Sequence, residues 1–425
     1  MVLIAIIFIT SLLVGIPIAF VLGLTGLTHL IVIDEPLFFN IITQRLFGGV
    51  NSFSLMCIPF FIMAGDFMNK GGVTRKLIDF IREMIGCVKG GIAYVVVVVA
   101  MILSAILGSA NAVAAMLCAV LVPEMKKDGY DDAFAGALIA ASSVLGPVVP
   151  PSVTFIIYGM LTGVSVSKLF LAGIVPGVVI AAGYAGVIMF YSKKHNFPKV
   201  NDSLDLKRLL RSFIAAVPAL VVPVIMLGGV LGGFFTPTES GAVAVAAAII
   251  AGVLYRTLKW KDIPAILLNT GSVTAAIMLI IAFGNIMGWT LAMDKVPQLI
   301  SDTILGITTN QHLVFAMILG FLILLGCVME GFASLIIFAP VLAVLANGVN
   351  IDPVHFGVII CLMLTIGLIT PPIGMLIFVV SNITNISLTR LSKAILPFAF
   401  VAFVLTVILA YIPDLVLFLP RVFGN

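Results

Sequence analysis

The two halves of this 425-residue chain repeat one another about 220 residues apart. Each half interrupts a long apolar segment with a pair of prolines, Pro150-Pro151 in the first half and Pro371-Pro372 in the second. The flanking segments also match, since residues 62–68 correspond to residues 281–287. Duplicated apolar halves that are broken at matching places are typical of secondary transporters, in which the substrate binds where the repeats meet.

Composition places the chain in a bilayer. It is 62% hydrophobic and 9% charged, whereas a soluble domain has about 25% charged residues. The net charge of +4 is too small to indicate a nucleic-acid surface. The sequence contains no glycine-rich phosphate loop ending in Gly-Lys-Ser or Gly-Lys-Thr, and no grouping of a nucleophile, a base and metal ligands. We therefore expect a membrane protein that is not an enzyme and that needs no cofactor.

The apolar runs predict five full crossings in each half, because a membrane-spanning helix needs about 20 residues. The crossings are expected near 1–15, 17–33, 52–68, 133–163, 169–191, 213–232, 238–257, 264–288, 355–386 and 395–419. Two further runs, 90–122 and 312–347, are interrupted centrally by small or polar residues and predict re-entrant hairpins. Segments 70–89 and 289–311 mix charged and apolar residues, which predicts helices along the membrane surface.

An odd number of crossings per half inverts the second copy, and the basic residues agree with this. With the N-terminus outside, eighteen of the 22 Lys and Arg residues lie on the cytoplasmic side; only Arg45, Lys168, Lys295 and Arg421 lie outside. The predicted fold class is an all-α polytopic membrane protein of two inverted-topology repeats, each with a re-entrant hairpin and a broken helix. Residues 1–192 form repeat 1, 193–211 a cytoplasmic linker and 212–425 repeat 2, with both termini periplasmic.

Each helix break predicts a cation site, because a broken helix leaves backbone carbonyls without intrahelical partners and oxygen atoms suit an alkali cation. We expect one Na⁺ site per repeat, each formed by a hairpin tip and a break. The first comprises Ser109, Asn111, Gly146, Val149 and Pro150, and the second comprises Gly326, Cys327, Gly367 and Thr370. The alternative is that these prolines only kink a structural helix.

The substrate is expected between the two sites, near the helix stubs that begin at Ser152 and Ile373, where amide groups and partial positive charge attract an anion. The candidate contacts are Ser142, Ser143, Ser152, Thr154 and Glu330. The hydroxyl groups could instead hydrogen-bond back to their own helix. Glu330 is an intramembrane acid and therefore a functional candidate. Glu239 follows Thr236-Pro237, where a helix cap is the commoner role than a cation contact.

At these residues the chain resembles the large membrane subunit of tripartite ATP-independent periplasmic (TRAP) transporters, the DctM-like family. The resemblance covers essentially the whole chain. The matching stretches are Ser54 through Gly65, Phe235 through Glu239, Leu145 through Tyr158, Ala172 through Gly177 and Gly367 through Gly374. Within the family, the chain is most similar to unfused subunits that carry sialic acid.

The resemblance implies a Na⁺-driven, elevator-type importer in a bacterial inner membrane. Its substrate would be a carboxylate such as sialic acid, a C4-dicarboxylate or another sugar acid. The implied partners are a periplasmic binding protein, which delivers the substrate, and a small four-helix membrane subunit. Two alternatives remain open. A divalent-anion/Na⁺ symporter would transport without a binding protein, and a passive channel would not saturate with substrate.

Overall fold

The computed structural model describes residues 2–33, 36–199, 205–371 and 373–424. Within these ranges every regular element is a helix, as the composition predicts. Seven of these helices are long and apolar enough to cross a membrane, and an eighth span results if a bent pair is counted as one. The seven are α10, α11, α12, α13 with η2, α15, α16 and α19.

The helices form two series with the same order of elements. The first series is α1 (Val2–Leu13), α2 (Ile18–Ile33), α3 (Pro36–Val50), η1 (Phe53–Met56), α4 (Cys57–Lys70), α5 (Val73–Ile85), α6 (Gly91–Leu107), α7 (Ala110–Lys127), α8 (Asp132–Ser143), α9 (Val153–Thr162) and α10 (Val166–His195). The second is α11 (Leu206–Leu231), α12 (Pro237–Leu254), η2 (Trp260–Asp262), α13 (Ile263–Met293), α14 (Val296–Ile307), α15 (Gln311–Val328), α16 (Gly331–Gly348), α17 (Pro353–Gly367), α18 (Met375–Thr384), α19 (Leu388–Tyr411) and α20 (Pro413–Phe423).

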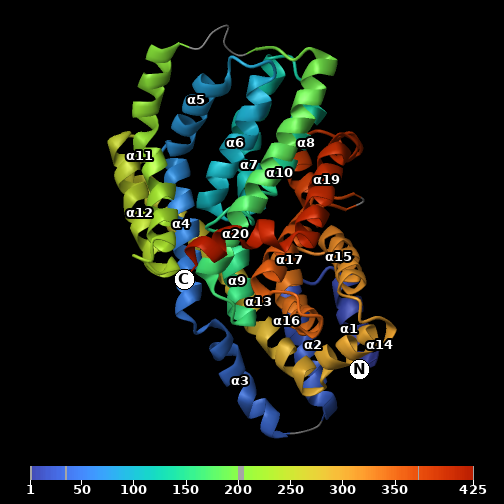
Figure 1. Cartoon of the computed structure of the whole chain (residues 1–425). Helices are drawn as coiled ribbons and strands as arrows, with labels where there is room; N and C mark the ends of the chain where they lie inside the picture. Colours follow the sequence, from blue (N-terminus) through green and yellow to red (C-terminus); the bar gives the residue numbers. More distant parts are fainter. Residues whose placement is uncertain (1, 34–35, 200–204, 372, 425) are drawn as a thin grey trace.

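Both predicted hairpins and both broken helices are present. The first hairpin is α6–α7 and the second is α15–α16. The first break separates α8 from α9, and the second separates α17 from α18. Figure 1 shows the first hairpin in the upper half of the molecule and the second hairpin in the lower half, as expected for inverted repeats. Each hairpin helix has 17 or 18 residues, or about 27 Å at 1.5 Å per residue, which exceeds a half-crossing of the membrane.

The sequence-based boundaries are wrong in two places. The sequence predicts no helix at residues 36–50, but these residues form α3. Helix α3 is bent by 54° from the segment that follows it. The crossing expected at 395–419 is in fact two helices, because Pro413 begins α20 and α19 ends at Tyr411. The predicted linker 193–211 lies partly outside the described residues, since its positions 200–204 are not described.

Helix ends follow the expected capping chemistry. Thr236 and Glu239 form a capping box at the start of α12, with the Thr236 amide donating to the Glu239 carboxylate at 2.8 Å. This confirms the capping role predicted for Glu239. Asp131 caps α8 and Asp352 caps α17, so equivalent helices in the two repeats begin in the same way.

The helices pack as two groups, and each group draws on both repeats. In the first group α2 packs against α13 and α4 packs against α12, with α1, α3 and α11 alongside. The second group contains the hairpins, the broken helices, α10, α19 and α20. Because helices of different repeats pair within each group, the sequence repeats are not separate bodies in space.

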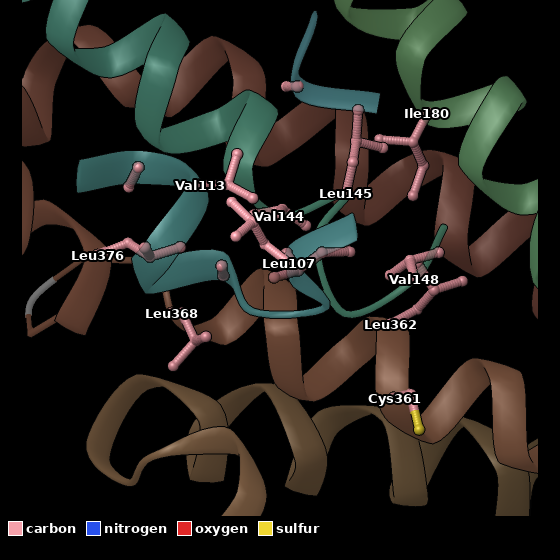
Figure 2. Packing of buried hydrophobic residues seen from close by; sticks show 14 of the residues in the cluster. Leu107, Val113, Val144, Leu145, Val148, Ile180, Cys361, Leu362, Leu368 and Leu376 are labelled. Atoms are coloured by element: carbon pink, nitrogen blue, oxygen red, sulfur yellow. The ribbon is translucent and has the colours of Figure 1, made fainter. Parts of the chain in front are cut away.

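The buried core of the second group surrounds the first break. Figure 2 shows Leu107 and Val113 of the first hairpin, Val144 and Leu145 of the first break, and Leu362 of α17 among the members of one apolar cluster. These side chains hold the hairpin against the break. The core therefore fixes the position of the hairpin tip.

Candidate functional site

The tips of both hairpins meet at one small cavity, which we call the central cavity. Its lining residues come from both repeats: Ser109, Ala110, Asn111, Pro147, Thr154, Glu330, Gly331, Phe332, Leu364, Thr365 and Leu368. Its volume of about 20 Å³ is enough for a single water-sized group. The sequence predicted one site per repeat, and the structure adds a shared space between the two.

The first hairpin tip places polar atoms at this cavity. Gly108 ends α6 in the left-handed region (φ +57°), and Ser109 is extended before α7 begins. A side chain at position 108 would be strained there and would also contact the Val153 backbone nitrogen at 3.3 Å. On the first turn of α7, Asn111 has a buried side-chain oxygen without a hydrogen-bond partner among the described residues. The tip therefore offers an acceptor that a bound cation would satisfy.

The first break lies directly against this tip. A Cβ added at Gly146 would lie 3.0 Å from the Ala110 nitrogen and from the Ser109 carbonyl carbon. Pro147 and Pro150 cannot donate a backbone hydrogen bond, so the helix cannot close over the break. Ser152 caps α9: its hydroxyl accepts from the Phe155 amide at 3.3 Å and donates to the Pro147 carbonyl.

The second hairpin tip differs in its chemistry. Met329 is extended, and Glu330 caps α16 by accepting a hydrogen bond from the Ala333 amide at 3.1 Å. The Glu330 side chain is partly buried and lines the central cavity. A carboxylate therefore stands at the junction of the repeats.

The second break packs even more closely on its hairpin. A Cβ at Gly367 would overlap the Cα atom of Gly326 and would lie 2.9 Å from the Cys327 nitrogen. The Thr370 hydroxyl donates to the Ile366 carbonyl at 2.8 Å, which leaves its oxygen lone pairs available. Pro372, the second proline of this break, lies outside the described residues.

Most carbonyls predicted to bind cations are free of backbone partners. The hydrogen bonds recorded for the described residues include none to the carbonyl oxygens of Gly146, Val149, Pro150, Gly326 or Cys327. The Gly367 carbonyl is the exception, since it accepts from the Thr370 amide at 3.0 Å. Unpaired carbonyls at a helix end need a donor or a cation. Unpaired carbonyl oxygens therefore lie at the first break and at the second hairpin tip, but not at Gly367 of the second break.

Helix N-termini make the rest of the central cavity favourable to an anion. First-turn residues of α7, α9 and α16 all line it: Ala110, Thr154 and Gly331. The start of α16 is neutralised by the Glu330 carboxylate, and α9 is capped by Ser152. Ser109 makes no side-chain cap for α7. The open N-terminus of α7 therefore contributes the largest unneutralised positive end.

The predicted residues fall into three classes of placement. Ser109, Asn111, Thr154 and Glu330 line the central cavity. The backbones of Gly146, Gly326, Cys327 and Gly367 lie at the two contacts between hairpin and break. The remaining six, which do not line the cavity, are Ser142, Ser143, Val149, Pro150, Ser152 and Thr370.

The two neighbouring serines of α8 differ. The Ser143 hydroxyl donates to the Ile139 carbonyl at 2.7 Å, the helix back-bond considered as an alternative. The Ser142 hydroxyl is buried without a partner in the part of the chain that the structure describes, away from the cavity. The Val149 side chain faces Gly177 of α10, so only its backbone could serve a cation.

Sequence reasoning missed several lining residues, among them Thr365, Phe332 and Leu368. The Thr365 hydroxyl donates to the Cys361 carbonyl at 2.6 Å. A polar residue one turn before a predicted break could have drawn attention to it. Phe332 and Leu368 are apolar, and no local signal distinguishes them from core residues.

Comparison with known proteins points to one family. The family model described as "Tripartite ATP-independent periplasmic transporter, DctM component" matches residues 5–415. The chain is 35% identical to the 2,3-diketo-L-gulonate TRAP transporter large permease protein YiaN of Escherichia coli (strain K12), over 95% of each chain. It is also 35% identical to the sialic acid TRAP transporter large permease protein SiaM of Vibrio cholerae, over 96% of each chain.

The fold also matches a solved structure. The YdaH transporter of Alcanivorax borkumensis, whose crystal structure is described as revealing an unusual topology, superposes with a TM-score of 0.64. The match covers 88% of this chain and 87% of that one, at 14% identity. At this identity the likeness concerns the fold alone.

Proposed function

Because the chain belongs to the DctM family of tripartite ATP-independent periplasmic transporters, we propose that it imports a small organic carboxylate with Na⁺ as the coupling ion. The family consists of multi-pass membrane permeases for organic acids and is not a catalytic family. The observation that carries the proposal is the central cavity, where two hairpin tips and two helix breaks of opposite repeats converge.

The carboxylate is proposed to bind at the open start of α7. Amide groups there lack a side-chain cap, and the Thr154 hydroxyl next to them is buried without a partner among the described residues. A carboxylate can accept hydrogen bonds from both. The volume of about 20 Å³ has room for one such group only, so a larger acid requires the tips to separate.

One Na⁺ per repeat is proposed to bind between each hairpin and its break. The support is the set of unpaired carbonyls, together with the Asn111 side-chain oxygen in the first repeat and the Thr370 hydroxyl in the second. Oxygen ligands from backbone and neutral side chains suit a hard cation. Among the described residues no three His, Cys, Asp or Glu side chains form a metal-binding group.

Transport is proposed to follow an elevator mechanism, in which the hairpin group moves against the group that contains α2, α4, α12 and α13. The support is an asymmetry between equivalent surface helices. Helix α5 packs against α6 and α11, whereas its counterpart α14 packs against α16. If α5 took up the packing of α14 and α14 that of α5, the state open to one side of the membrane would become the state open to the other side.

The proposed partners are a periplasmic binding protein and a small four-helix membrane subunit, because the family is tripartite. The proposed location is the bacterial inner membrane with both termini periplasmic. Sialic acid is the first substrate to test. The two relatives compared above have equal identity and different substrates in their names, so competition by a panel of sugar acids and dicarboxylates must decide.

Electrogenic uptake tests the proposal. Two Na⁺ with one monoanion move one net positive charge, and 100 mV inside-negative then adds about 2.3 kcal/mol, or roughly 50-fold accumulation. Proteoliposomes with the chain and its partners should import a monoanion faster when valinomycin makes the lumen negative. Indifference to the potential would exclude the two-cation scheme, and uptake without the binding protein would indicate a stand-alone symporter instead.

A further inference from the structure

A second, larger pocket lies on the surface between α5 and α11, far from the hairpin tips. These helices pack side by side (Figure 1). The pocket has a volume of about 590 Å³ and is lined by Lys76, Asp79, Arg82, Glu83, Arg208, Arg211, Ser212 and Ala215. We call it the α5–α11 pocket. Its lining is mostly charged, which is unusual in a chain with 9% charged residues.

Two of the four basic side chains in this pocket are already engaged. Arg82 pairs with Glu124 at 3.1 Å, and Arg208 pairs with Asp205 at 3.4 Å. For Lys76 and Arg211 no ion pair occurs among the described residues, and both side chains are exposed. Because they stand on different helices and face one pocket, they can act together on a single anion.

The α5–α11 pocket lies beside the first turns of α11, a helix long and apolar enough to cross a membrane. Immediately after Arg211 and Ser212, α11 exposes large apolar side chains: Phe213 at 43%, Ile214 at 62%, Val217 at 38%, Val221 at 41% and Val224 at 66%. Exposed apolar residues along a membrane-spanning helix face lipid. An anion in the pocket would therefore sit at headgroup depth, directly above a surface that contacts acyl chains.

We propose that the α5–α11 pocket binds the headgroup phosphate of an anionic phospholipid such as phosphatidylglycerol, with Lys76 and Arg211 as its main contacts. Basic pockets between helices on the cytoplasmic side are suited to anionic headgroups, and this end of the molecule carries the predicted cytoplasmic charges. The apolar surface below the pocket favours a lipid over a soluble phosphate. The bound lipid would contact both α5 and α11, which pack against each other.

The counterparts of α11 and α5 in the other repeat, α1 and α14, line a pocket of a different kind. This pocket of about 460 Å³ is lined by residues of α1, α2, α13, α14 and α16. Its lining includes Ile4, Phe8, Val296 and Ile300 and contains no charged side chain. A headgroup phosphate would be unpaired at that position. The proposal therefore assigns the phosphate site to one repeat only.

The test is lipid binding by native mass spectrometry on the purified full chain, titrated with phosphatidylglycerol or phosphatidylcholine. The Lys76→Ala/Arg211→Ala variant removes both contacts. Lys193→Ala/Lys194→Ala is the charge-matched control, since these exposed lysines lie outside the pocket. Each basic side chain near an anionic lipid contributes roughly fivefold in affinity. The pocket variant should bind phosphatidylglycerol about 25-fold more weakly, with the control and phosphatidylcholine unchanged.

Equal loss in the control variant would show only a general charge effect and would overturn the site. Displacement of the lipid by millimolar inorganic phosphate would assign the pocket to a soluble anion. Loss of phosphatidylglycerol when the small membrane subunit assembles with the chain would assign the pocket to that subunit. Retention of the lipid in the assembled complex, together with the 25-fold effect, supports the proposal.

Discussion

The tips of the first and second hairpins occupy equivalent places in the two repeats, yet they present different groups to the central cavity. Ser109 precedes α7 and leaves its first turn uncapped, whereas Glu330 precedes α16 and caps it with a carboxylate. Asn111 adds an unpartnered neutral oxygen on the first side. One wall is therefore positive through backbone dipoles and the other carries a negative side chain.

The difference shows how a duplicated backbone can serve two ions of opposite charge. Both repeats keep the same geometry, a hairpin tip against a glycine in a helix break. The side chains at that geometry have diverged. The anion proposed at the start of α7 lies in the cavity, and the cations proposed at the hairpin–break contacts lie beside it, so that each ion offsets the desolvation cost of the other.

The largest expected effect compares the two break glycines. In Gly367→Ala the new methyl group overlaps the Gly326 backbone, whereas in Gly146→Ala the nearest atoms lie 3.0 Å away. Overpacking typically costs about 1–3 kcal/mol, so we expect about 3 kcal/mol for Gly367→Ala and about 1 kcal/mol for Gly146→Ala. Thermal unfolding in detergent measures both. Equal melting temperatures would contradict the tighter packing of the second repeat.

The second effect concerns the negative charge of Glu330, which lines the central cavity from the second repeat. Glu330→Gln keeps an oxygen for the Ala333 amide but removes the negative charge. We expect the Na⁺ concentration for half-maximal uptake to rise at least tenfold, or about 1.4 kcal/mol. Uptake over a Na⁺ series in proteoliposomes measures this. Glu330→Ala removes both the charge and the helix cap, so it should also lower the free energy of unfolding by about 1 kcal/mol. An unchanged Na⁺ requirement in Glu330→Gln would remove the carboxylate from cation binding.

A smaller effect is expected when a neutral cation ligand is removed from either repeat. Asn111→Ala in the first repeat and Thr370→Val in the second each delete one neutral oxygen. Each should raise the Na⁺ requirement about fivefold, because one neutral hydrogen-bonding group contributes about 1 kcal/mol. The same Na⁺ series with matched protein levels tests both. If neither variant differs from the parent chain, the two-site scheme fails.

The smallest effect concerns the positive wall. The Thr154 hydroxyl has no partner in the described structure, so Thr154→Val removes an unsatisfied group without a loss of stability. We expect the KM for the carboxylate to rise about threefold with the Na⁺ requirement unchanged. Melting temperature and substrate kinetics together provide the measurement. A lower melting temperature with unchanged KM would make Thr154 a structural residue.

Much of the fold follows from local sequence signals. Paired prolines, central polar residues in apolar runs and the Thr236–Glu239 cap predict the breaks, the hairpins and the start of α12, and the structure has all of them. The lengths of α3 and α19 were not predictable in the same way. Helix α3 is short and lies beside α13, so its stability comes from packing, while the end of α19 depends on one proline, Pro413.

The site was predictable only in its parts. Local polarity selected Ser109, Asn111 and Glu330, and all three line the cavity. The two hairpins line one cavity although their residues lie about 220 positions apart in the sequence. Hydrophobic periodicity is a local property and does not predict contacts between such distant residues. For the same reason Phe332 and Leu368 read as ordinary core residues. The opposite chemistry of the two walls emerges only when the tips are placed together.

The most direct test is a structure of the complete complex with Na⁺ and its substrate acid, at a resolution that places the carboxylate. The account predicts that the carboxylate accepts hydrogen bonds from the first-turn amides of α7 and from Thr154, on the side of the central cavity opposite Glu330. Na⁺ should lie at the contact between each hairpin and its break. A carboxylate bound away from both breaks, or next to Glu330, would contradict the assignment of the anion to the start of α7.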